Sequence, residues 1–201
     1  MAASAALDEE TARAELYGLL AQLYYSAPPA ELLAQLRVAV TEAPSAGGLL
    51  EEPWQQLVGA ARAQGDAAIT AEFERLFGVT GKPEVFLYAS HHLSGFLNEK
   101  PLARLRSDLD ALGLARSEAM PETEDHIAYL CEAMRYLIAG DDMAVCNLAT
   151  QRDFFAAHLQ PWVPALCDGL EAHPAAAFYG ALARFTRAFA AIEAQGFDML
   201  E

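Results

Sequence analysis

The side chains best suited to acid–base chemistry gather at residues 122–126, where the sequence reads Glu-Thr-Glu-Asp-His directly before an apolar helical pattern. Asp125 and His126 are the residue types of a hydrolytic dyad. Neighbours on a helix diverge by about 100°, so on a helix these two side chains do not form the oriented hydrogen bond of a triad. No Gly-x-Ser-x-Gly motif supplies a nucleophile. A small helical hydrolase using Asp125 and His126 therefore stands only as an alternative function.

The sequence offers no complete motif for a cofactor or a metal. A phosphate loop ends in Lys followed by Ser or Thr, but Lys82 is followed by Pro83. The paired Glu-x-x-His motifs of di-metal bundles are missing. His91 and His92 are adjacent, with no cysteine near them for a zinc site. The sequence therefore predicts no metal and no cofactor.

The run from Glu122 to Asp125 also has the composition of a helix N-terminus. Thr123 or a nearby residue is expected to cap the helix, while the carboxylates complement the helix dipole. A histidine bordering an apolar stripe is usually a partly buried residue with a satisfied hydrogen bond, which is the expectation for His126. The stripe expected to be buried is Ile127, Leu130, Cys131, Met134, Leu137 and Ile138.

These residues must be positioned by helices, because helical periodicity runs through nearly the whole chain. Patterns bounded by Pro or Gly occupy residues 7–29, 29–44, 53–65, 66–79, 100–114, 122–138, 141–159, 161–173 and 174–196. Residues 44–52 and 115–125 read as connectors, and residues 78–98 as an irregular segment. The sequence predicts an all-α fold, a single globular bundle of about eight to ten helices that forms one domain over residues 1–201.

The charge of the chain limits its partners. With 28 acidic and 13 basic residues, the formal net charge is −15. Such a chain repels phosphate backbones and anionic lipids, so nucleic acid and membrane insertion are not expected. A cationic ligand or peptide fits better, although acidity that serves only solubility explains the composition equally simply.

The cysteines and the N-terminus point to the cytoplasm. The three cysteines are odd in number and lie among apolar helical residues, which favours reduced, buried thiols. The first residues have neither the basic region nor the apolar run of a secretory signal. No run of about 18 apolar residues occurs, so no membrane span is predicted.

Four recognisable patterns follow one another: residues 71–79, residues 87–95, the signature-like residues 122–126, and one C-terminal helical pattern made of residues 154–166 and 177–193. Together they resemble the TorD/DmsD/NarJ family of molybdoenzyme maturation chaperones, whose signature is Glu-Pro-x-Asp-His. The likeness covers most of the chain from residue 12. Thr123 stands where the signature has proline, and Ala89 where many members carry an acidic residue.

The resemblance implies a TorD-like helical fold and a cytoplasmic protein that is not an enzyme. Family members bind the twin-arginine signal peptide of a molybdoenzyme precursor, or its apo form, and delay export until the molybdenum cofactor is inserted. Some members bind guanine nucleotide weakly, which is not predicted here because no phosphate loop is present. Domain-swapped dimers occur in the family, so a monomer and a homodimer both stay open.

The signature gives Asp125 and His126 a peptide-binding role by resemblance. Carboxylates such as Glu124, and Glu122 beside it, suit the arginines of a signal peptide as charge-assisted pairs. An apolar groove for the following run is expected from Phe73, Leu76, Phe77 and Tyr88, with Ser90 in the same irregular segment as Tyr88. At helical spacing, residues such as Phe73, Leu76 and Phe77 more often form a buried core than a binding face.

The client enzyme is not identified by the sequence. Residues 88–116 and 131–138 look most like those of members associated with formate dehydrogenases, and a reductase for dimethyl sulfoxide or trimethylamine N-oxide stays open. Besides the hydrolase, a generic helical protein-interaction module is the remaining alternative.

Overall fold

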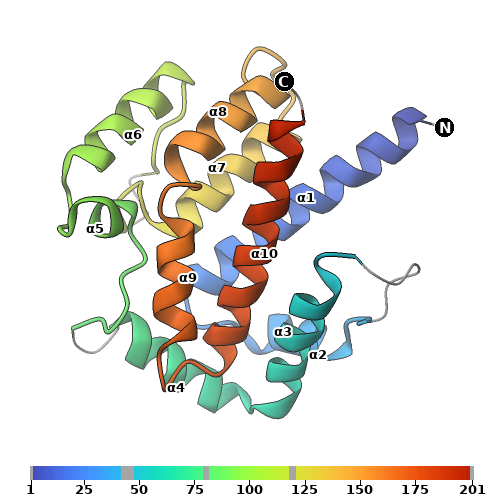
Figure 1. Cartoon of the computed structure of the whole chain (residues 1–201), viewed down its shortest axis with the longest axis vertical. Coiled ribbons are helices and arrows are strands. Elements are labelled where there is room, and N and C mark those ends of the chain that lie inside the picture. The colour runs from blue at the N-terminus through green and yellow to red at the C-terminus, as the bar shows by residue number, and fades with distance from the viewer. Residues whose placement is uncertain (1, 42–47, 79–81, 118–120, 200–201) are drawn as a thin grey trace. The chain divides into compact units, whose positions relative to one another are not determined.

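The computed structural model describes residues 2–41, 48–78, 82–117 and 121–199, and within these ranges the protein forms ten α-helices and no strand (Figure 1). The predicted all-α fold is confirmed. The helices are α1 (Ala2–Tyr25), α2 (Ala30–Val38), α3 (Glu51–Ala63), α4 (Asp66–Phe77), α5 (Ala89–Ser94), α6 (Lys100–Ala111), α7 (Ile127–Ala139), α8 (Leu148–His158), α9 (Val163–Glu171) and α10 (Phe178–Asp198). No helix in the described part of the chain is long and apolar enough to cross a membrane.

The helices belong to two compact units, each built from separate parts of the chain. Unit 1 comprises Met1–Tyr25 and Leu87–Trp162, and it contains α1 and α5 to α8. Unit 2 comprises Ser26–Phe86 and Val163–Glu201, and it contains α2 to α4, α9 and α10. The single domain expected over residues 1–201 stays a prediction.

The core of unit 1 is centred on the packing of α1 against α7. Leu23 and Tyr24 of α1 have no exposed surface, and neither do Met134 and Leu137 of α7. All six residues of the stripe predicted on α7 are buried, with Ile138 the most exposed at 8%. Burial of this stripe against α1 supplies the hydrophobic free energy that fixes the orientation of α7.

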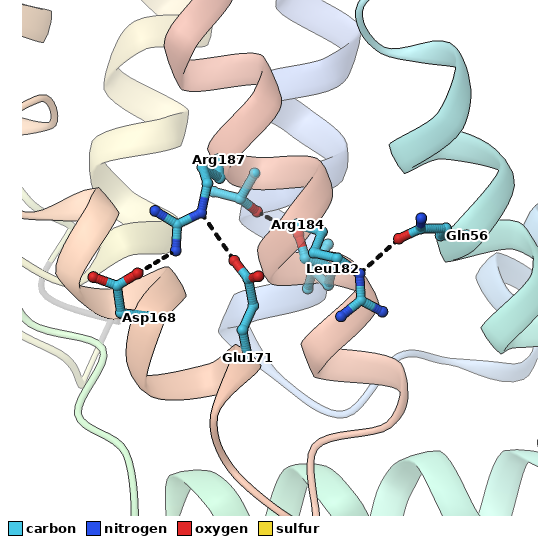
Figure 2. Close-up of polar contacts among 7 residues, drawn as sticks. Gln56, Asp168, Glu171, Leu182, Arg184 and Arg187 are labelled. Carbon is cyan, nitrogen blue, oxygen red and sulfur yellow. Dashed lines mark hydrogen bonds and ion pairs between the residues drawn. The ribbon is translucent and has the colours of Figure 1, made fainter.

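Unit 2 is organised around α10, which packs against α9, α3 and α4. On its surface, the Arg187 guanidinium binds Asp168 at 2.6 Å and Glu171 at 2.9 Å, and Arg184 donates to Gln56 of α3 at 2.6 Å (Figure 2). Exposed pairs of this kind contribute little to stability, roughly 0–1 kcal/mol each.

A buried carboxylate makes the stronger connection in unit 2. Glu72 of α4 is 7% exposed, and its two oxygens accept hydrogen bonds from the backbone N–H groups of Phe178 at 3.1 Å and Tyr179 at 2.7 Å. These N–H groups belong to the first turn of α10, which has no partners for them within the helix. The Glu72 side chain therefore caps α10 from another helix.

Several helices differ from the sequence expectation, and α7 and α8 begin at Ile127 and Leu148, later than the patterns that start at residues 122 and 141. The irregular segment predicted at residues 78–98 contains a short helix, α5, whose backbone N–H groups find acceptors elsewhere in unit 1. The pattern expected to run to residue 44 stops at Val38, where the backbone becomes extended at Ala39, and Arg62 of α3 donates to the carbonyls of Arg37 at 2.8 Å and Ala39 at 3.0 Å. These bonds satisfy carbonyl groups at the end of α2. Parts of the predicted connectors at 44–52 and 115–125, and of the glycine-containing stretch 78–84, lie outside the described residues.

Candidate functional site

The turn at residues 122–126 is tied to the start of α5 by a short antiparallel bridge between Tyr88 and His126. The backbone N–H of Ala89 donates to the Asp125 carbonyl at 3.0 Å, and that of Ile127 donates to the Leu87 carbonyl at 2.9 Å. Two segments far apart in the chain are thereby joined immediately before α5 and α7 begin.

The Asp125 carboxylate is the buried centre of this junction. Asp125 is 1% exposed, and its Oδ2 accepts from the Ser90 backbone N–H at 2.9 Å. Its Oδ1 accepts from the Thr123 hydroxyl at 2.7 Å. A carboxylate at this place caps the free N–H groups at the start of α5 and complements the helix dipole. Hydrogen bonds to the charged carboxylate offset the cost of burying it.

His126, not Thr123, caps α7. The His126 Nδ1 accepts from the Ala128 backbone N–H at 3.2 Å, and the helix begins at Ile127. The cap is thus a residue near Thr123, as the sequence left open, but the expectation of carboxylates in the first helical turn is wrong. The peptide group of His126 instead donates to the Thr123 carbonyl at 3.0 Å, so the acidic residues form a turn before the helix.

The His126 ring is held neutral. His126 is 4% exposed, and its ring lies 5.1 Å from that of Tyr88 and 5.8 Å from that of Tyr129, centroid to centroid. Burial lowers the pKa of His126 to about 4, although the charges of Glu122 and Asp125 act in the opposite direction. Nδ1 is used as a helix cap and both Asp125 oxygens are used by Ser90 and Thr123, an arrangement that differs from a hydrolytic dyad.

Glu122 and Glu124 are also engaged. Glu124 Oε2 lies 2.8 Å from an Arg106 nitrogen, and its Oε1 lies 3.5 Å from Nε of Arg116. Burial alone would raise the pKa of Glu124, but the hydrogen bond and charge of Arg106, with the charge of Arg116, outweigh it and lower the pKa. The Glu122 carboxylate accepts a hydrogen bond from the Tyr88 hydroxyl, whose pKa is raised by burial and by Glu122.

A cavity of about 470 Å³ lies beside this turn, within unit 1. Its walls come from α1, from α7, and from the end of α6 with the segment that follows it, and they are mainly apolar. Tyr25 and Tyr136 on its wall are partly exposed, at 37% and 44%. The lining residues are Ala21, Gln22, Tyr25, Leu109, Leu114, Ala115, Arg116, Ser117, Glu124, Ala128, Tyr129, Leu130, Glu132, Ala133 and Tyr136.

The predicted site residues of unit 1 lie in different environments. Glu124 lines the cavity, while Ser90, Asp125 and His126 are buried and hold the turn and the two helix starts. Tyr88 and Glu122 are half-buried.

Three of the predicted residues belong to unit 2. Phe73 and Leu76 are buried in its core, at 6% and 0% exposure, and Phe77 is half-buried. The rings of Phe73 and Phe77 lie 5.8 and 5.0 Å from that of Tyr179. Their helical spacing therefore reflects packing against α10.

Sequence reasoning missed most of the cavity. Its walls depend on small residues, Ala21 of α1 and Ala128 and Ala133 of α7, which leave space between larger apolar neighbours. Alanines on facing helices were the available signal, but they are common in helices for other reasons. In the described ranges, no group of three or more His, Cys, Asp or Glu side chains is arranged to hold a metal ion.

The site therefore combines an all-α fold with a mainly apolar cavity beside a buried carboxylate junction. The model of the nitrate reductase delta subunit family matches residues 44–168, and the chain belongs to this family. The predicted membership of the TorD/DmsD/NarJ group of maturation chaperones is thereby confirmed.

The relatives found among curated proteins are named chaperones. The chain is 31% identical over 128 residues to "Chaperone protein TorD" of Vibrio cholerae serotype O1 strain ATCC 39541, covering 60% of this chain and 58% of the relative. It is 30% identical over 128 residues to the protein of the same name from strain ATCC 39315, with the same coverage. The chain thus matches over 58% of the length of these relatives.

Asp125→Asn is expected to destabilise unit 1 by about 2 kcal/mol, because a neutral amide with one acceptor oxygen replaces the charged carboxylate that accepts from both the Ser90 N–H and the Thr123 hydroxyl. Thr123→Val, which removes only the hydroxyl donor, should cost about 1 kcal/mol. Urea unfolding measures both, and amide exchange at Ala89 and Ser90 should accelerate most in Asp125→Asn. Equal stability of Asp125→Asn and the wild type would contradict this role.

His126 should make stability depend on pH. Its folded pKa of about 4 lies below the ordinary value of 6.5, so the unfolded chain takes up the proton first as the pH falls. The contribution is complete above pH 6.5 and is lost between pH 6.5 and 4, by up to about 3 kcal/mol. His126→Asn keeps a good N-cap without the titration. Unfolding at pH 7, 5.5 and 4.5 should show a flatter dependence in the variant, and identical curves would refute the prediction.

Proposed function

We propose that the protein is a cytoplasmic chaperone, not an enzyme, that acts in the maturation of a molybdoenzyme. It binds the twin-arginine signal peptide of the precursor, the apo form of the enzyme, or both, and assists cofactor insertion before export. Membership of the nitrate reductase delta subunit family and relatives named chaperone protein TorD support this proposal. The client is an enzyme of the formate dehydrogenase type or a reductase for dimethyl sulfoxide or trimethylamine N-oxide.

The observation that carries the proposal is the cavity between α1 and α7. Its volume of about 470 Å³ is within the range of ligand sites, and its walls are mainly apolar. Partly exposed Tyr25 and Tyr136 are amphipathic side chains suited to a protein interface. An apolar run of a signal peptide fits such a groove by burying alternate or helically spaced side chains.

Charge favours a cationic partner at the same place. Glu124 and Glu132 line the cavity, and the formal net charge of the chain is −15. A strongly acidic protein speeds the encounter with a basic peptide and repels acidic competitors. Arginine is the suitable cation, because its planar guanidinium pairs with a carboxylate through two parallel hydrogen bonds.

The signature residues act in this proposal mainly by positioning. Asp125, His126 and Ser90 hold the junction between the turn at residues 122–126 and the start of α5. The half-buried hydrogen bond between Tyr88 and Glu122 joins the same two segments. The junction places Glu124 at the cavity and fixes where α7 begins. Phe73, Leu76 and Phe77 serve the packing of unit 2, so peptide contact by these three is not part of the proposal.

The proposal predicts binding of a peptide with two adjacent arginines followed by ten apolar residues. Ala133→Trp fills the cavity and should weaken this binding about tenfold or more, because a well-packed contact surface is lost. Ala139→Trp is the matched control, since Ala139 lies on the same helix and is exposed outside the cavity. Titration calorimetry measures both, after circular dichroism establishes that each variant is folded.

If Ala133→Trp and Ala139→Trp bind the peptide with equal affinity, the cavity is not the binding site. Absence of peptide binding by the wild type, together with absence of a molybdoenzyme from affinity capture in its own cytosol, would end the proposed function. Capture also identifies the client, and sedimentation of the same sample distinguishes a monomer from a homodimer.

A further inference from the structure

The segment that follows α6, residues 113–117, lies along the cavity and forms part of its wall. Gly113, with φ of +70°, ends the helix, and its N–H donates to the Asp110 carbonyl at 3.0 Å. The Leu114 N–H donates to the Leu109 carbonyl at 2.9 Å, after which the chain is not helical. A left-handed glycine of this kind turns the chain sharply away from the helix axis. Every residue from Leu114 to Ser117 then lines the cavity.

The side chains of this segment have the chemistry proposed for the ligand. Leu114 contributes an apolar side chain to the cavity, and Arg116, two residues later, brings a guanidinium to the carboxylate of Glu124. Arg116 Nε lies 3.5 Å from Glu124 Oε1, and its Nη1 donates to the Glu122 carbonyl at 3.2 Å. The cavity thus already holds an arginine beside an apolar residue, supplied by the chain itself.

Glu124 divides its two oxygens between two arginines. Oε2 accepts from Arg106, at 3.0 Å from Nε and 2.8 Å from the second nitrogen, while Oε1 faces Arg116 at 3.5 Å. Arg106 is fixed on α6 and makes two close contacts. Arg116 reaches Glu124 only by the longer contact and does so from a non-helical segment, although its side chain is less exposed than that of Arg106, at 34% against 52%. Arg116 is therefore the more easily displaced of the two.

We infer that Arg116 is an internal surrogate for the ligand, occupying a guanidinium subsite made by the Glu124 carboxylate and the Glu122 carbonyl. The inference rests on the proposed function. An incoming arginine replaces Arg116 at the same two acceptors, so the Glu124 carboxylate keeps two arginine partners after the exchange. A peptide lacking arginine must leave Arg116 in place or separate it from Glu124 without compensation. The device selects arginine-bearing segments against merely apolar ones.

Lysine is a poorer competitor in this subsite. The carboxylate oxygen of Glu124 and the carbonyl oxygen of Glu122 are contacted by different nitrogens of one planar guanidinium. A lysine ammonium is a compact, strongly hydrated charge that does not reproduce this fork. Discrimination between arginine and lysine in the ligand is therefore expected to depend on Glu124.

The test uses a synthetic peptide with two adjacent arginines followed by ten apolar residues, and a second peptide with lysines in place of the arginines. Arg116→Gln should tighten binding of the arginine peptide about two- to fivefold, the range that loss of one exposed ion pair allows. Arg104→Gln is the matched control. It makes the same change in net charge on α6, and its nearest carboxylate is Asp108, at 3.8 Å. It should change affinity less than twofold, within the range of a weak exposed pair.

Glu124→Gln completes the experiment. It should weaken the arginine peptide and reduce the difference between the two peptides, and Arg116→Gln added to it should have no further effect. If the wild type binds but Arg116→Gln binds equally or more weakly, the surrogate is overturned while the proposed function stands. If Arg104→Gln tightens binding as much as Arg116→Gln, net charge explains the effect and the surrogate is again overturned. Absence of binding by every variant overturns both.

Discussion

The buried carboxylate of Asp125 joins the start of α5 to the turn before α7, and the candidate site depends on that junction. Its two oxygens bind the Ser90 N–H and the Thr123 hydroxyl, while the neighbouring backbone bridges Tyr88 to His126. Because a buried charge is tolerated only with such partners, the two segments are held in one register. The register determines where Glu124 meets the cavity and where the α7 stripe meets α1.

A buried carboxylate also caps the start of a helix in unit 2. Glu72 reaches from α4 to the first N–H groups of α10, a sequence separation of more than 100 residues. In each unit, a helix that lacks a local cap receives a carboxylate from a distant part of the chain. The backbone N–H groups at the starts of α5 and α10 find no acceptor in a neighbouring side chain. These helix starts therefore depend on tertiary structure.

The sequence predicted what depends on local periodicity. The helices, the α7 stripe and the family followed from apolar spacing and from the order of short patterns, all of which are properties of neighbouring residues. The position of Asp125 and His126 was found through the signature. The burial and satisfied hydrogen bond of His126 were also expected, but the capping role of Asp125 was not, because its partner Ser90 lies 35 residues away.

Thr123 shows the same limit at one residue. Its hydroxyl secures Asp125 through a hydrogen bond where the family signature has proline, a substitution that the sequence marked only as a departure. The helix α5 was missed because six residues are too few to establish a period. The cavity was missed because its walls come from three separate segments. The pairing of Glu124 with Arg106 and Arg116 could not be predicted either, because it forms only when the folded chain brings these segments together.

The central claim is that an arginine-bearing apolar peptide binds in the cavity of unit 1. The most direct measurement places a photoreactive phenylalanine analogue in the apolar run of the peptide and maps the cross-links by mass spectrometry. The account predicts cross-links to residues 21–25 of α1, 109–117, and 128–136 of α7, the segments that line the cavity. Cross-links confined to unit 2, such as at Phe77 of α4, would contradict it.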